Sequence, residues 1–154
     1  MAINFEDLEV YQAAKNFRHR IFTLTTKLPP DEKYVLVPQM KRAALAVTNK
    51  IAEAHDDADN WKTMIACMHR SHGCINELID DLGLCADQKY FKPVHLTDLR
   101  KDADEVVRLI SEYIKQLQAQ LAAYMDEQRK KRAAQKSKFA RGPSAGPRKP
   151  WSPR

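Results

Sequence analysis

Two cysteines and two histidines, side chains that bind zinc in proteins, fall within one short stretch, at Cys67, His69, His72 and Cys74. The stretch lies in a segment of helical periodicity, where successive residues are about 100° apart around the axis. Cys67 and Cys74 would then lie about 20° apart on one side, with His69 and His72 on the other. One helix cannot direct both pairs at a single tetrahedral ion, so we expect no metal site. We expect the cysteines to pack as small buried hydrophobes.

The same stretch contains nominal pairs of a nucleophile and a base: Cys67 or Cys74 with His72, and Ser71 with His69 or His72. A working nucleophile also needs an orienting group and an oxyanion hole, held in a concave pocket. Nothing in the sequence supplies these, so we expect no catalytic residue and no enzymatic activity.

An acidic cluster, Asp56, Asp57 and Asp59, follows the second of the helical segments described below. It lacks the glycine and the bidentate glutamate that a calcium loop carries at fixed spacing. A solvated turn between helices is therefore expected, with chelation of a divalent cation as the alternative. The chain also has only four glycines and no Gly-rich phosphate loop, and we expect no cofactor.

Four segments carry helical periodicity, and none shows sustained strand alternation. They run from about residue 5 to 27, from 31 or 38 to 54, from 60 to 86, and from 97 to 124. Pro29 and Pro30 end the first, Pro38 opens or bends the second, and Thr97 is a candidate cap for the fourth. Four amphipathic helices with short connectors can bury their apolar sides in an antiparallel up-and-down four-helix bundle, so the predicted fold is all-α.

The third segment has the most continuous apolar stripe, and the connector after it carries two aromatic residues. The connector, residues 88–94, holds Tyr90 and Phe91 and is expected to fold back onto the end of the bundle. The stripe predicted to be buried comprises Trp61, Ile65, Met68, His72, Ile75, Ile79 and Leu82.

The positive charge of the chain is concentrated at its C-terminal end. Residues 126–154 hold ten Lys/Arg against Asp126 and Glu127, a net +8, whereas the first 125 residues hold 16 Lys/Arg against 18 Asp/Glu, a net −2. A cationic arm on a near-neutral body indicates a polyanionic partner, because phosphates attract it and release counterions on binding. The cations of this arm are Arg129, Lys130, Lys131, Arg132, Lys136, Lys138, Arg141, Arg148, Lys149 and Arg154.

We therefore divide the chain into a bundle, residues 1–125, and a basic tail, residues 126–154, expected to be largely disordered when free. Residues 127–136 are the part that could extend the last helix. Trp151 lies among the terminal cations, where it could stack on a base or dock in a protein groove, or make no fixed contact.

Four cations of the bundle are further candidates for nucleic-acid contacts: Arg18, Arg20, Lys41 and Arg42. The alternative for each is ordinary surface charge paired with a neighbouring carboxylate.

No apolar run approaches the ~18 residues that span a bilayer, and the tail has no continuous apolar face for a membrane surface. Residues 1–7 lack the basic and apolar regions of a signal peptide, and three is an odd number of cysteines. We expect a cytoplasmic protein without a membrane partner.

Five motifs, in order and at fitting separations, resemble the four-helix-bundle family of proteins encoded in 23S ribosomal RNA intervening sequences. Residues 5–14 resemble the family's F-x-D-L-x-V-W-Q-x-A opening, and residues 28–32 its F-P-x-E-E. Residues 39–44 resemble Q-I-R-R-A-A, residues 51–54 match part of N-I-A-E-G, and residues 73–78 resemble G-S-L-x-E-L. The chain departs from the family pattern at Ala46, Lys50, Ala54 and His72.

This resemblance implies a cyclic homo-oligomer, typically a pentamer, with no established enzymatic activity. A related branch, the accessory variability determinant of diversity-generating retroelements, works with a reverse transcriptase and its template RNA. The hypothesis from sequence is thus a non-catalytic, homo-oligomeric scaffold that binds nucleic acid, RNA in preference to DNA, most specifically as an accessory subunit of a retroelement reverse transcriptase. The alternative is an intervening-sequence-type bundle that acts only as a protein-interaction module.

Overall fold

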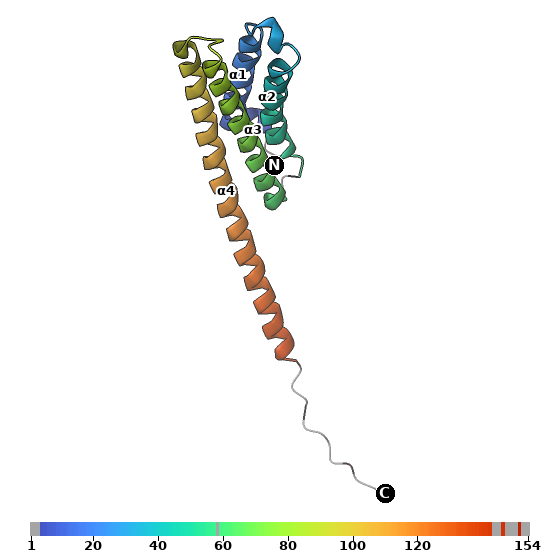
Figure 1. Cartoon of the computed structure of the whole chain (residues 1–154). Helices are drawn as coiled ribbons and strands as arrows, with labels where there is room; N and C mark the ends of the chain where they lie inside the picture. Colours follow the sequence, from blue (N-terminus) through green and yellow to red (C-terminus); the bar gives the residue numbers. More distant parts are fainter. Residues whose placement is uncertain (1–3, 58, 143–145, 147–150, 152–154) are drawn as a thin grey trace. The chain divides into compact units, whose positions relative to one another are not determined.

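The computed structural model describes residues 4–57, 59–142, 146 and 151, and these residues form helices and their connections, with no strand among them. Two short 3-10 helices, η1 (Phe5–Asp7) and η2 (Pro30–Glu32), accompany four long helices: α1 (Glu9–Thr25), α2 (Leu36–Glu53), α3 (Trp61–Asp87) and α4 (Pro93–Ala140) (Figure 1). The predicted all-α four-helix bundle is confirmed. The chain divides into two compact units, residues 1–120 and residues 121–154, which are described separately below.

The 3-10 helices η1 and η2 precede α1 and α2, and local contacts set where the two long helices begin. The first predicted helix is shorter than expected, because the chain makes the 3-10 turn η1 before α1 starts at Glu9. α2 begins at Leu36, so Pro38 lies in its first turn, where a missing backbone donor costs nothing. The amide of Leu36 donates to Glu32 Oε2 (3.3 Å), which caps this end of α2 from η2.

Both ends of α4 differ from the prediction. The helix begins at Pro93, and Thr97 is not its cap but lies one turn inside, donating its hydroxyl to the Pro93 carbonyl (3.0 Å). α4 also continues beyond Tyr124 to Ala140. Residues 127–136 are thus helical, as the possible extension of the last helix allowed, and residues 137–140 of the predicted disordered tail are helical as well. Residues 121–140 contain no glycine, proline or β-branched residue, and this composition favours a helix even without burial.

The core lies within the first unit and takes side chains from all four helices, including Phe17, Met40, Ile75 and Ile110, each at most 1% exposed. Burying one such side chain contributes roughly 1.5–3 kcal/mol. Few polar groups enter the core. The hydroxyl of Ser71, which is fully buried, donates to the Val47 carbonyl (2.9 Å) and so joins α3 to α2.

The buried side of α3 is rotated from the predicted stripe. Met68, Ile75 and Leu82 are buried as predicted, whereas Trp61, Ile65, His72 and Ile79 are only partly buried. The predicted stripe omitted two large apolar side chains, Met64 and Leu78, as well as small or polar side chains that face the core. The α3 residues that are buried but were not in the predicted stripe are Met64, Cys67, Ser71, Leu78, Asp81 and Cys85.

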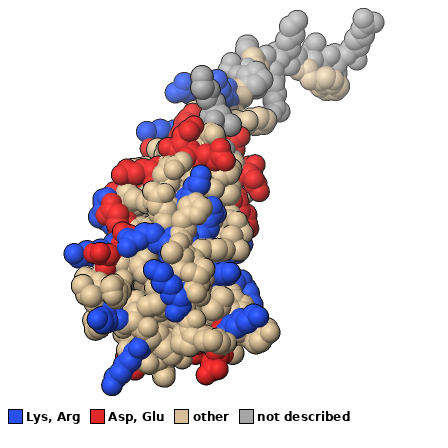
Figure 2. Space-filling model, turned by 90° about the horizontal axis from the view of Figure 1, so that it is seen from above, with Lys and Arg blue, Asp and Glu red and all other residues tan. Residues whose placement is uncertain are grey.

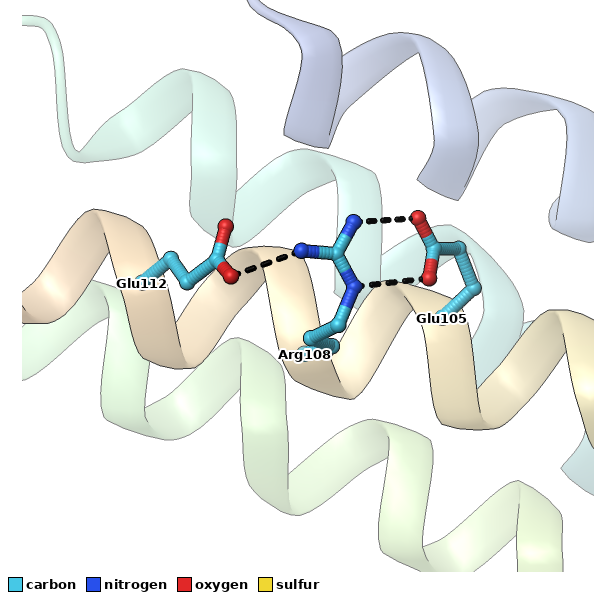
Figure 3. Close-up of polar contacts among 3 residues, drawn as sticks. All are labelled: Glu105, Arg108 and Glu112. Carbon is cyan, nitrogen blue, oxygen red and sulfur yellow. Dashed lines mark hydrogen bonds and ion pairs between the residues drawn. The ribbon is translucent and has the colours of Figure 1, made fainter.

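On the exposed side of α4, Arg108 bridges two carboxylates (Figure 3). Its guanidinium binds Glu105 with two hydrogen bonds (2.6 and 2.8 Å) and Glu112 with one (2.6 Å). These bonds lower the pKa of Glu105, and the spacing of three and four residues supports the helix. Because all three side chains are about half exposed, the contribution to stability is small, but the arginine is neutralised.

A buried carboxylate is incompletely paired between α2 and α3. Asp81 is 3% exposed, and its Oδ1 accepts a hydrogen bond from Gln39 Nε2 (2.7 Å). Its Oδ2 has no partner among the described residues. Burial raises the pKa of Asp81, the Gln39 hydrogen bond opposes this, and the charges of Asp80 and Glu77 add to it.

The raised pKa of Asp81 predicts that stability falls as the pH rises from about 4 towards neutrality, because the folded state then holds a proton that the unfolded chain has lost. Asp81→Asn keeps an acceptor for Gln39 and removes the charge. We expect it to abolish this part of the pH dependence of the free energy of unfolding. Urea denaturation at pH 5 and pH 8 measures it, with the exposed Asp57→Asn as control; equal pH profiles for wild type and Asp81→Asn would contradict the prediction.

Candidate nucleic-acid interface

The predicted basic tail is a helix over most of its described length. The C-terminal segment, defined here as residues 121–142, comprises the last part of α4 and two further residues. Trp151 is 84% exposed. Arg148, Lys149 and Arg154 lie outside the described residues. The candidate site residues within the C-terminal segment, all exposed, are Arg129, Lys130, Lys131, Arg132, Lys136, Lys138 and Arg141.

Two of these cations are paired along the helix. Lys130 Nζ lies 3.0 Å from Asp126 Oδ2, and Lys131 Nζ lies 2.6 Å from Glu127 Oε1, both one turn apart with the acid on the N-terminal side. The Lys131 hydrogen bond lowers the pKa of Glu127. These exposed pairs support the helix weakly and take up both acidic residues of the segment.

The other five cations make no ion pair within the described part of the chain, and three of them share one side of the helix. At about 100° per residue, Arg129, Arg132 and Lys136 fall within about 60° of one another. Lys138 and Arg141 fall on other sides. The unpaired charge is thus concentrated along a single line of three cations spaced three and four residues apart.

Apolar side chains accompany this line, and the sequence reasoning missed them. Phe139 is 86% exposed and Met125 is 47% exposed, both on the side of Arg132. Had the helix been extended past residue 124, the spacing of Met125, Arg132 and Phe139 would have revealed the mixed stripe. A shallow groove along this side of the segment is lined by Tyr124, Met125, Gln128, Arg129, Arg132, Ala133, Lys136, Gln135 and Phe139.

The four candidates in the bundle have different surroundings. Arg20 forms an ion pair with Asp102, which agrees with the alternative that it is a surface charge paired with a carboxylate. Arg18 is half-buried and donates to Thr48 Oγ1 (2.7 Å), and Lys41 Nζ lies 5.5 Å from the centre of the Phe22 ring. Neither of these two has a carboxylate partner among the described residues.

Arg42 is exposed, with no ion pair in the part of the chain that the structure describes.

Charge is unevenly distributed along the bundle. Residues 8–52 carry eight Lys/Arg against three acids, while residues 53–125 carry eight against thirteen. Seen end-on, most acidic side chains gather in one part of the view, and Lys and Arg spread over the rest (Figure 2). The two stretches carry equal numbers of cations, and it is the net positive charge of the bundle that belongs to the stretch containing α1 and α2.

The cysteines and histidines of α3 do not converge. Cys67 and Cys85 are buried and Cys74 is partly buried, which confirms the predicted packing, while His69 is exposed. Burial raises the pKa of each thiol, that of Cys85 to about 11, which disfavours the nucleophilic thiolate. Among the described residues no group of three or more His, Cys, Asp and Glu side chains is arranged to hold a metal ion.

The fold and this surface define a helical-bundle protein with a cationic C-terminal helix. Within the described residues, no helix is both long enough and apolar enough to pass through a bilayer. The family model of the 23S rRNA-intervening sequence protein matches residues 6–112, and the chain belongs to this family.

Among solved structures, the chain is similar to a protein of unknown function from the S23 ribosomal protein family of Bacteroides thetaiotaomicron. The two are 23% identical with a TM-score of 0.63, and the match covers 69% of this chain and 95% of the other. At this identity the likeness concerns the fold alone. A comparison with curated proteins found no match.

The protection of backbone amides is predicted to change along α4. Residues between Leu96 and Leu117 supply buried side chains to the core, whereas residues 122–140 have none. Amides of residues 122–140 should therefore exchange with solvent at least about a hundredfold faster than those of residues 103–114. Hydrogen exchange followed by NMR measures this, and equal protection along the helix would contradict it.

Proposed function

We propose that the protein is a non-catalytic, homo-oligomeric scaffold that binds nucleic acid through the C-terminal segment. The observation that carries the proposal is the line of Arg129, Arg132 and Lys136, which are exposed and have no carboxylate partner among the described residues, beside the exposed ring of Phe139. Cations spaced along a helix suit the regularly spaced phosphates of a strand, and an exposed ring can stack on a base. Such a surface offers little readout of base sequence.

A single segment of this kind would bind weakly and with strong dependence on salt. The family resemblance implies a ring, typically of five chains, and linked segments would bind one polynucleotide with much higher avidity. Lys41, Arg42 and Arg18 of α1 and α2 would add contacts from the bundle. We favour RNA over DNA because the related accessory branch works with a template RNA.

The most specific form of this proposal is an accessory subunit of a retroelement reverse transcriptase. It rests on the resemblance to the bundle family and on the basic segment that such a role would use. Co-expression with the reverse transcriptase of the same genetic element tests it: a stable complex of protein, enzyme and template RNA supports the role. If no complex forms while the protein still binds RNA, the accessory role is refuted and the proposal of a general nucleic-acid-binding scaffold stands.

The triple change Arg129→Ala, Arg132→Ala and Lys136→Ala should weaken binding of single-stranded RNA and reduce its salt dependence. Each phosphate contact contributes about −0.7 to the slope of log K against log salt, so the slope should become less steep by about two. Fluorescence anisotropy with a labelled oligonucleotide between 50 and 300 mM salt measures this.

The matched control is Lys62→Ala, Lys92→Ala and Lys115→Ala, which removes the same charge from exposed positions of the bundle. This variant should retain the wild-type slope. Equal loss in both triple variants would mean that net charge alone attracts RNA, and an unchanged slope in the first would refute the interface.

Oligomerisation gives a separate test. Sedimentation of the full chain should yield a particle of several subunits, and oligonucleotides long enough to reach two segments should bind at least about tenfold more tightly than short ones. A monomer at micromolar concentration, or affinity independent of length, would remove the ring from the proposal.

A further inference from the structure

The bundle contains a cleft that the proposed interface does not use. It has a volume of about 590 Å³ and lies between α1 and the beginning of α4. A volume of this size is within the range of small-molecule sites. The residues that line it are His19, Arg20, Thr23, Leu24, Lys27, Phe91, His95 and Leu99.

Basic side chains without partners surround this cleft. His19, Lys27 and His95 are exposed, and none of the three side chains makes a hydrogen bond or ion pair with another described residue. Arg20 is the exception, since it is paired with Asp102. No lining residue is a carboxylate, so the cleft offers several donors for an anion, and the acid beside it, Asp102, is paired with Arg20.

The inner surface of the cleft is apolar. Leu24 and Leu99 are 7% and 4% exposed, and Phe91, from the connector before α4, is partly buried against the core. His95 lies in the first turn of α4, at the positive end of the helix dipole. The cleft thus combines an apolar lining that includes an aromatic residue with basic side chains.

We propose that this cleft binds a 5′-nucleoside monophosphate, with the base against Phe91 and the two leucines and the phosphate among Lys27, His95 and His19. A base provides the planar apolar group that the inner surface suits, and the phosphate supplies the acceptors that the three basic side chains lack. The same chemistry occurs in a free mononucleotide and at the 5′-phosphorylated end of a strand. Only the strand form of the ligand rests on the proposed function.

Titration of the full-length protein with adenosine 5′-monophosphate, followed by NMR of the histidine rings and by calorimetry, tests the site. The ring signals of His19 and His95 should shift, and adenosine and inorganic phosphate should each bind at least about tenfold more weakly than the nucleotide. Equal affinity for inorganic phosphate, or absence of nucleotide binding, would overturn the proposal.

Variants at exposed positions locate the binding without disturbing the core. Lys27→Ala and His95→Gln should each reduce nucleotide affinity about tenfold, while Lys33→Ala, an exposed lysine outside the cleft, should not. Nucleotide binding that survives both cleft variants would refute the site.

A pair of oligonucleotides, with and without a 5′-phosphate, distinguishes the two sources of the ligand. A preference for the phosphorylated strand that Lys27→Ala abolishes assigns the site to strand ends, and no preference assigns it to the free nucleotide. The variant with Arg129, Arg132 and Lys136 changed to alanine should lose RNA affinity and keep mononucleotide affinity. Failure of the interface and failure of the cleft are therefore separate results.

Discussion

The packing of α4 against the core is the interaction on which the helical C-terminal segment depends. Its buried residues, from Leu96 to Leu117, fix the helix, and forming the first turns is the costly step of helix formation. Once those turns exist, each added residue needs only a favourable local propensity. The C-terminal segment can therefore be helical although it buries nothing, and its cations are arranged along an axis rather than distributed over a random coil.

The relation between burial and hydrophobicity explains which parts of the fold could be predicted from the sequence. The apolar periodicity of α1, α2 and α4 marks residues that are buried, such as Phe17, Met40 and Ile110, because there burial and hydrophobicity coincide. In α3 they do not coincide. Ser71 is buried because the Val47 carbonyl accepts its hydroxyl, a contact between residues distant in sequence that no local pattern reports. The end of α4 was less certain for a related reason, since the apolar stripe ends near Tyr124 and an extension over residues 127–136 could be named only as a possibility, whereas the helix continues to Ala140.

The candidate interface was predictable in composition and not in geometry. The excess of Lys and Arg after residue 125 is evident from counting, but the division into paired and unpaired cations depends on the helix. The spacing that pairs Lys130 with Asp126 and Lys131 with Glu127 leaves Arg129, Arg132 and Lys136 together. Arg108 differs from these three cations. It is also exposed, but its charge is neutralised by the carboxylates of Glu105 and Glu112.

The two proposed binding surfaces stand in different relations to the family. The match to the family covers residues 6–112, which includes every residue that lines the cleft and none of the C-terminal segment. The segment lies outside the matched residues, so the match to the family carries no information about a function located there. The cleft is formed by the bundle itself, where α1 meets the start of α4, so it depends on the same packing that holds the fold. Binding there would be governed by shape and by a few directed hydrogen bonds, and would be less sensitive to salt than counterion release along the segment.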